Sequence, residues 1–322
     1  MTLEIVPPFA NISQEQAIKY LWENGHEPTF PAKKKIYYTV LRPVLPVFLR
    51  RLLQKKMNSK VIAKDCFIDD GLVKIVFQDG MNSAALSRLY PGGNTSAVVL
   101  THDVETRSGF RFIPRVIDLE NRYNFKSSWN IVPYKYPIDP AIIQAIRENG
   151  HEVGIHGYNH DGRMYLSKKI FDKRAPLINQ ALDKYGAVGF RSPMVHRNLA
   201  WLQMLNIEYD SSCFDYDPYQ PFPGGTGSIW PFVAGKFVEL PYTLPQDHTL
   251  FYVLKKRDIS LWKKKTDWIC EHGGVVLSLT HPDYLQERNH LGLYEEFLQY
   301  LSGLKNSWRC LPKELAAWWK RN

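Results

Sequence analysis

The stretch Glu152-Val153-Gly154-Ile155-His156-Gly157-Tyr158-Asn159-His160 decides how the rest of the chain is interpreted. A short apolar run ends in one histidine, and a second histidine follows four residues later. If the run is a buried strand and the chain then turns into a helix or a tight loop, the two imidazoles can converge. Side chains one helical turn apart lie about 5–6 Å from each other at Cβ, close enough to share a metal ion. The alternative is one packed and one exposed histidine.

Apolar runs of this kind recur after Pro91-Gly92-Gly93-Asn94, where the sequence predicts a break. Seven of them read as strands: 97–101, 126–131, 152–156, 187–191, 207–211, 236–240 and 275–280. Most of the gaps predict helices, among them 168–185 and 259–271. The clearest helix follows Asp139 at the N-cap and Pro140 at the first position, and Gly150 lies past its end. Repeated strand–helix units predict an α/β protein with a parallel sheet, open or closed into a barrel.

Two segments depart from this alternation. Residues 212–235 are rich in proline, glycine and aromatic residues, and we predict a long surface loop there. Residues 1–95 predict a small amino-terminal appendage, with two short strands around an Asp-Gly turn at 66–77. The expected organisation is therefore a basic appendage, 1–95, and a main domain, 96–322.

The positive charge of the chain is concentrated in residues 31–64. This segment contains ten basic residues and no acidic one, whereas the net charge of all 322 residues is +9. Because the segment is also rich in apolar residues, it could lie on an anionic membrane face, each cation contributing about 1 kcal/mol. A packed helix with a solvated basic face is the alternative. No recognised nucleic-acid module surrounds the segment, so we expect no nucleic-acid partner.

Composition and termini predict an ordinary globular protein. The chain is 44% hydrophobic, and its four cysteines are far apart, which favours reduced thiols over disulfides or a zinc knuckle. The first residues lack the pattern of a signal peptide, and no apolar run is long enough to span a bilayer. We expect a cytoplasmic protein, peripheral on the inner membrane face if the basic segment binds lipid.

Polar residues follow five of the predicted strands at their carboxyl ends, where the loops of a parallel barrel build active sites. They are Asp103 and Glu105, His156 and His160, Arg191, Asp210, and His281. Two imidazoles, one carboxylate and an open position form a catalytic zinc arrangement. Asp103 and Glu105 can divide the tasks of base and ligand, and His281 can protonate a leaving group. Arg191 would hold the base through a bidentate contact; a structural ion pair is the alternative.

These motifs resemble the polysaccharide deacetylases of carbohydrate esterase family 4, over roughly residues 96–310. The resemblance rests on His102-Asp103-Val104-Glu105, on His156 through His160, on Arg191-Ser192-Pro193-Met194 and on Leu279-Thr280-His281. It implies a distorted (β/α)7 barrel and a metal-dependent N-deacetylase, with a divalent metal such as Zn²⁺. It further implies Asp103 as base, Glu105, His156 and His160 as ligands, and His281 as acid. Met194 would help to hold the oxyanion, and Leu279 would line the acetyl pocket.

The chain departs from the family pattern in two places. Val104 separates the two acidic residues of the first motif, which many members have adjacent. The fourth motif, an aspartate–tryptophan pair that tunes the acid histidine, has no clean match: Asp210, Asp215 and Asp217 are candidates for the aspartate, and Trp230 for the tryptophan. Trp230 could also stack on sugar rings, and Tyr242 in segment 241–248 could line the pocket.

The expected partner is an N-acetylated glycan or a precursor of one. A non-sugar amidase on the same barrel and an inactive carbohydrate-binding protein are the alternatives.

Overall fold

The computed structural model describes residues 4–6, 35–46, 49, 73, 89–220, 225–287 and 289–321. Most of the predicted appendage, including the proposed strands at 66–77 apart from Val73, lies outside these ranges. The boundary at residue 95 therefore stays a prediction. Within the described ranges, no helix is long and apolar enough to cross a membrane.

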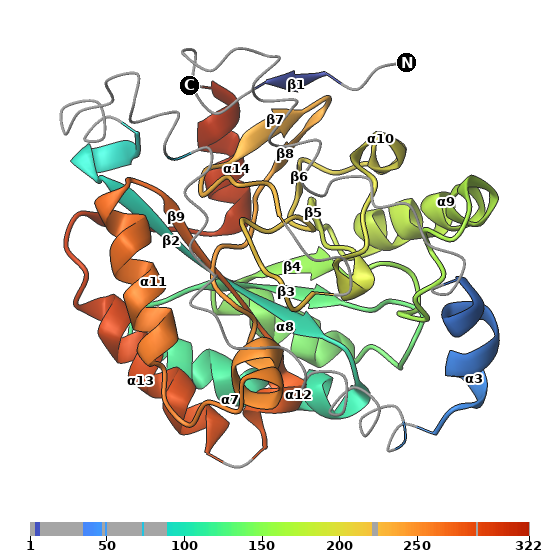
Figure 1. Cartoon of the computed structure of the whole chain (residues 1–322), viewed down its shortest axis with the longest axis horizontal. Coiled ribbons are helices and arrows are strands. Elements are labelled where there is room, and N and C mark those ends of the chain that lie inside the picture. Colours follow the sequence, from blue (N-terminus) through green and yellow to red (C-terminus); the bar gives the residue numbers. More distant parts are fainter. Residues whose placement is uncertain are drawn as a thin grey trace.

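A curled parallel sheet forms the centre of the molecule (Figure 1). Seven parallel strands follow the spatial order β9-β2-β3-β4-β5-β6-β8. They are β2 (Ser96–Val104), β3 (Ser127–Ile131), β4 (Glu152–Ile155), β5 (Gly189–Phe190), β6 (Tyr209–Asp210), β8 (Phe237–Glu239) and β9 (Val275–Thr280). Each of the seven predicted runs overlaps one of these strands, so the predicted α/β class and the positions of these seven strands are confirmed.

The curl is closed without a strand ladder between β8 and β9. Instead, the backbone N–H groups of Thr243 and Leu244 donate to the carbonyl of Leu277 at 3.1 and 3.3 Å. Three further strands extend the sheet: β7 (Phe232–Ala234) and β1 (Ile5–Val6) pair antiparallel beyond β8, and β10 (Ser307–Arg309) pairs with the start of β2. The barrel is distorted because its last gap is spanned by a loop.

Helices lie around the outside of the curled sheet (Figure 1). The longer ones are α7 (Arg107–Arg122), α8 (Pro140–Glu148), α9 (Lys168–Lys184), α11 (Ser260–Glu271), α13 (His290–Ser302) and α14 (Pro312–Arg321). The short ones are η2 (Tyr37–Leu41), α3 (Arg42–Val44), η3 (Pro91–Gly93), η4 (Pro193–Val195), α10 (Leu199–Leu202), η5 (His248–Val253) and α12 (Pro282–Leu285). The Asp139 carboxylate caps α8 through the N–H of Ala141 at 2.9 Å, as the sequence predicts.

Strand β2 shows how the fold separates its side chains. All nine residues are buried, as expected for a central parallel strand covered on both faces. Because side chains alternate along a strand, Val98 and Leu100 pack outward under the helices, whereas Ala97 and Val99 pack inside the curl. Asp103 continues the inner row, and His102 continues the outer row.

The prediction of a long surface loop at 212–235 is wrong. Residues 225–230 are buried or nearly so, and Phe232–Ala234 forms β7. The aromatic side chains are the reason, because they bury large apolar areas. Phe214 packs against Tyr242 with ring centroids 5.4 Å apart, and Trp230 is fully buried.

Candidate metal and catalytic site

Three side chains from two strand ends converge on one point. Glu105 follows β2 and His156 follows β4, while His160 lies in the loop beyond β4. One ligand atom from each lies within 4.8 Å of the others. The route from His156 to His160 is a tight loop, and His160 adopts a left-handed backbone with φ of 59°. The structure thus brings together the three metal ligands that the sequence predicts.

The ring of His156 is oriented for metal binding. Its Nδ1 lies 3.0 Å from the carbonyl oxygen of Arg191 and donates to it, which leaves the lone pair on Nε2 free to bind a metal. This Nε2 is buried and has no hydrogen-bond partner among the described residues. Burial lowers the pKa of His156 to about 4, so the ring is neutral at physiological pH. A neutral imidazole with an orphaned buried nitrogen fits a metal ligand.

The third candidate ligand is the Glu105 carboxylate, whose Oε1 lies 3.0 Å from His160 Nε2. Burial raises the pKa of Glu105, but His160 outweighs it and holds the pKa well below its usual range. The site therefore offers two imidazole nitrogens and one ionised carboxylate oxygen. This donor set suits zinc and neighbouring divalent transition metals.

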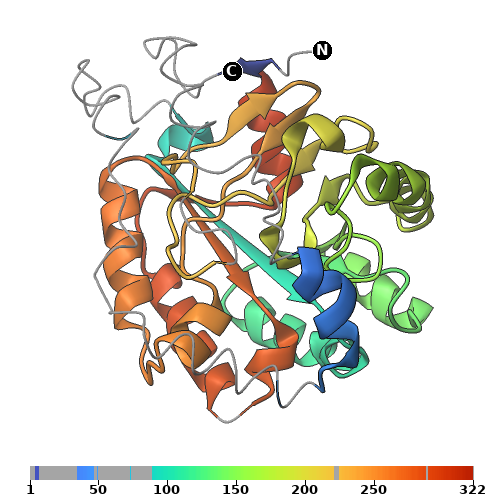
Figure 2. The ribbon, with the colours of Figure 1, turned by 45° about the vertical axis from the view of Figure 1, so that its right-hand side comes forward.

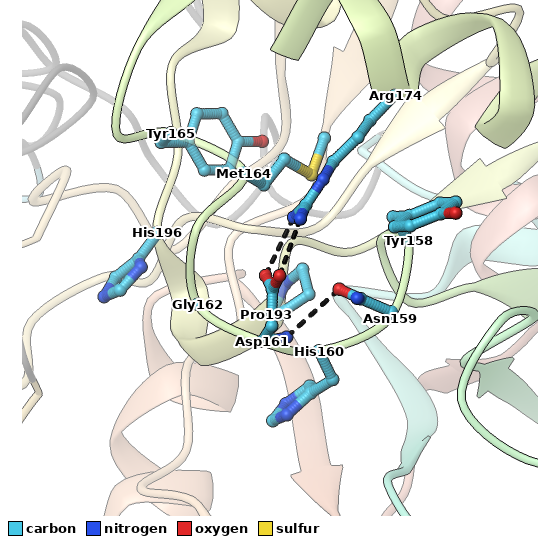
Figure 3. A pocket seen from close by; sticks show the side chains of 10 residues that line it. All are labelled: Tyr158, Asn159, His160, Asp161, Gly162, Met164, Tyr165, Arg174, Pro193 and His196. Carbon is cyan, nitrogen blue, oxygen red and sulfur yellow. Dashed lines mark hydrogen bonds and ion pairs between the residues drawn. The ribbon is translucent and has the colours of Figure 1, made fainter. Parts of the chain in front are cut away.

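A salt bridge anchors the loop that carries His160 (Figure 3). From α9, Arg174 donates to both carboxylate oxygens of Asp161 at 2.8 and 2.6 Å. The imidazole of the neighbouring His160 points away from this pair in the close-up. Gly157 lets the loop turn: its φ is +66°, and a Cβ there would lie 2.4 Å from the Pro193 ring. The salt bridge and the packing of Gly157 against Pro193 therefore hold the loop in place, while the His160 imidazole stays directed away from the salt bridge (Figure 3).

Asp103 occupies the inner face of β2, next to the ligands. Its Oδ1 accepts from Asn130 at 3.0 Å and from Arg191 at 3.1 Å, and its Oδ2 lies 3.6 Å from His156 Nε2. Burial raises the pKa of Asp103, yet His156 and Arg191 together outweigh it and lower the pKa. The carboxylate is thus ionised, with one oxygen directed toward the metal site.

Arg191 contacts Asp103 through one nitrogen only, so the predicted bidentate contact is wrong. The other donors of this fully buried guanidinium bind Ser211 and Thr101. The short β5 places Arg191 in the barrel core, where its remaining N–H groups need acceptors. Arg191 nevertheless contacts the Asp103 carboxylate, and its role in holding the base stays a prediction.

His281 follows β9 and faces the ligands from the other side, with Nε2 3.8 Å from Glu105 Oε1. Its Nδ1 lies 2.7 Å from Oδ1 of Asp247, and its backbone N–H donates to the other oxygen at 2.7 Å. Burial lowers the pKa of His281, but Asp247 more than offsets this and raises it to about 10. The imidazole is therefore protonated at neutral pH and carries a proton on Nε2.

Asp247 is the partner of His281 that sequence reasoning missed. Asp210, one of the three sequence candidates for this role, instead accepts from the Ser212 hydroxyl at 2.7 Å and lies against Glu239. The assignment of Asp210 as the partner of the acid histidine is therefore wrong. The available signal was the position of Asp247 in segment 241–248 after the sixth strand, which we expected to line the pocket. The gap of 34 residues to His281 concealed the pairing.

Both roles considered for Trp230, the tryptophan of the fourth motif and a sugar-stacking surface, are wrong. Its indole N–H donates to the carbonyl of Gly273 at 2.9 Å, just before β9 begins, at the end of the barrel opposite the site. Tyr242 and Leu279 are buried in the inner core, and the Tyr242 hydroxyl accepts from Gln246 at 3.1 Å. Met194 is partly exposed and has a left-handed backbone with φ of 58°. Substrate contacts of Met194, Leu279 and Tyr242 stay predictions.

The fold and its polar rim define a distorted α/β barrel with a candidate metal centre at the carboxyl ends of its strands. The model of the family Polysaccharide deacetylase matches residues 92–202, which contain Asp103, Arg191 and all three candidate ligands. A peptidoglycan deacetylase of Helicobacter pylori is 23% identical over 235 residues, covering 59% of this chain and 77% of that protein. Residues 92–202 thus match the family that the motifs resemble, and the curated relative has the same kind of activity in its name.

Solved structures share the fold. A Mycobacterium smegmatis protein designated a polysaccharide deacetylase superposes with a TM-score of 0.60 at 20% identity, covering 72% of this chain and 92% of that one. A Pseudomonas aeruginosa protein with the same designation gives 0.59 at 16% identity, covering 72% and 93%. At these identities the likeness concerns the architecture alone, and it confirms the barrel expected from the motifs.

Proposed function

We propose that this protein is a metal-dependent deacetylase that hydrolyses the N-acetyl groups of an amino-sugar glycan or of a glycan precursor. The main support for the proposal is that two groups whose pKa values are shifted in opposite directions lie on either side of the candidate ligand set. Asp103 is ionised beside His156, and His281 is protonated beside Glu105. The match of residues 92–202 to the polysaccharide deacetylase model and the similarity to a peptidoglycan deacetylase of H. pylori support an acetylated glycan as substrate.

Glu105, His156 and His160 would hold the metal, for which we propose Zn²⁺. When bound, a divalent metal supplies Lewis acidity that polarises the acetamide carbonyl and favours deprotonation of water. The chain's own residues then handle the protons. Asp103 accepts a proton through Oδ2 as water attacks the carbonyl carbon, while Asn130 and Arg191 hold Oδ1.

The second half of the reaction needs a proton donor. His281 donates its Nε2 proton to the amine nitrogen as the C–N bond breaks, and Asp247 stabilises the imidazolium before the transfer. The products are a free amino sugar and acetate. In this proposal the backbone N–H of Met194 donates to the developing oxyanion, and Leu279 lines the space for the acetyl methyl group.

The test combines metal analysis with a product assay. Elemental analysis of the purified protein should find about one divalent transition metal per chain, because three ligands with an open position form a catalytic site. His156→Ala should lose the metal, and Asp103→Asn should keep it. Acetate release from N-acetylglucosamine oligomers should occur with the wild type and fail with both variants. Release from small amides but not from sugar oligomers would identify a non-sugar amidase, and a wild type that cannot be loaded with metal would overturn the proposal.

A further inference from the structure

A short amino-terminal helix, residues 35–44, packs beside the site and turns a row of apolar side chains outward. It comprises η2 and α3 with continuous right-handed backbone geometry from Ile36. Its inward side is formed by Tyr38, which is 7% exposed and lies with its ring 5.1 Å from that of His196. Figure 2 shows this helix in blue in front of the sheet.

The helix is attached directly to the loop that carries His160. Arg163 donates to the carbonyl oxygens of Tyr38 and Thr39 at 3.3 and 3.1 Å, and Arg42 donates to the carbonyl of His160 at 3.4 Å. A Cβ on Gly162 would meet the Tyr38 ring at 2.5 Å. Anything bound to the outer side of this helix is therefore held beside the candidate metal ligands.

The outer side of the helix is apolar. Ile36, Val40 and Val44 recur at intervals of four residues, which places them in one row, and they are 55%, 59% and 75% exposed. Leu41 beside them is 46% exposed. Among the described residues, the remaining exposed large hydrophobic side chains (Val6, Tyr134 and Met204) are not on this helix. A surface helix normally turns such a row toward the core, so this row indicates a binding partner.

The charge around the row selects the partner. Lys35 is exposed next to it, and the sequence from 31 to 64 contains ten basic residues and no acidic one. A symmetric contact between two copies would set this charge against itself. A nucleic acid would match the charge but leave the aliphatic row exposed to water. An anionic lipid surface satisfies both, because aliphatic side chains enter the acyl region while Lys and Arg meet the headgroups.

We propose that the helix 35–44 docks on an anionic lipid bilayer through Ile36, Val40, Leu41 and Val44, and that this docking holds the metal-ligand loop at the membrane surface. The inference does not depend on the deacetylase reaction. It would place substrates that are attached to or adsorbed on that surface within reach of the site.

The experiment is vesicle co-sedimentation of the full chain. The wild type should bind vesicles of phosphatidylglycerol and phosphatidylcholine, bind phosphatidylcholine alone much more weakly, and lose binding in high salt. V40S/V44S should bind anionic vesicles more than about tenfold more weakly, because two aliphatic groups no longer enter the bilayer. The matched control V6S/M204S changes two exposed apolar residues elsewhere and should bind as the wild type does.

Several outcomes would overturn the proposal: no wild-type binding to anionic vesicles, equal binding to both vesicle types, or unchanged binding of V40S/V44S. Light scattering after gel filtration tests the rival partner, a second copy of the chain. A wild-type dimer that V40S/V44S disrupts, found together with no vesicle binding, would assign the apolar row to that second copy. Thermal unfolding confirms that both double variants fold. Activity on soluble oligomers should equal the wild-type value in both, so failure of lipid docking and failure of the proposed function are distinguishable.

Discussion

The two carboxylate oxygens of Asp247 each bind His281, one at Nδ1 and the other at the backbone N–H, both at 2.7 Å. The carboxylate thus fixes the ring orientation and the charge of the imidazole together. Replacing it with an amide of the same shape would retain much of the orientation and remove the charge.

Asp247→Asn is therefore predicted to lower the pKa of His281 from its raised value of about 10. The proposed mechanism requires His281 to be protonated as the acid, so a lower pKa of His281 would move the alkaline limb of the pH–rate profile to lower pH. We also expect kcat to fall by about 10²-fold or more. The measurement is acetate release between pH 6 and 10, with metal content unchanged as the control. A profile that keeps its alkaline limb would separate Asp247 from proton donation.

Arg174→Lys is predicted to weaken metal binding without touching the ligands. Lysine cannot make the two-pronged contact with Asp161, so the loop carrying His160 loses its anchor. By analogy with outer-shell substitutions, affinity should drop by roughly tenfold. Competition with a zinc chelator measures it. Arg122→Lys is the matched control, because the Arg122–Glu295 pair is exposed and contacts no ligand. Equal affinities in both variants would contradict the anchoring role.

Gly157→Ala is predicted to destabilise the fold more than Gly93→Ala does. Both glycines have positive φ, +66° and +74°, so both substitutions cost about 1–2 kcal/mol of backbone strain. Only at Gly157 would the new Cβ meet another group, the Pro193 ring at 2.4 Å; nothing lies within 4 Å of a Cβ at Gly93. Chemical denaturation of both variants gives the difference. Similar losses would mean that Pro193 moves aside without cost.

Glu152→Gln should change how stability depends on pH. Burial raises the pKa of Glu152 to about 7 from its ordinary 4.5, and the Tyr209 hydroxyl donates to it. The folded state therefore binds more protons than the unfolded state between these values. The contribution of Glu152 to stability is full below pH 4.5 and is lost as pH rises through 7.

The measurement for Glu152 is the melting temperature of wild type and variant from pH 4 to 9. The wild type should lose stability relative to Glu152→Gln as pH rises toward 7, with a constant difference above that pH. The comparison cancels other titrating groups because both proteins share them. Parallel curves across the range would show that Glu152 ionises equally in both states.

The sequence alone identified the seven strands of the curled parallel sheet and the candidate ligand set of this protein. The strands could be predicted because parallel strands buried on both faces are nearly continuous in apolar residues, as in β2. The caps of α8 could be predicted because they follow from local backbone chemistry. Glu105, His156 and His160 were identifiable because each closely follows a strand, and the carboxyl ends of parallel strands share one face of the barrel.

Only the tertiary structure decided which distant residues pair. Asp247, not Asp210, meets His281, because the loop that closes the gap between β8 and β9 brings segment 241–248 across the end of the sheet. Phe214, Trp230 and Phe232 became core because neighbouring elements covered them, which composition does not encode. The outward apolar row of the amino-terminal helix is visible only once Tyr38 is seen to take the inner side. Local chemistry fixes what a segment can form, whereas packing fixes what it faces.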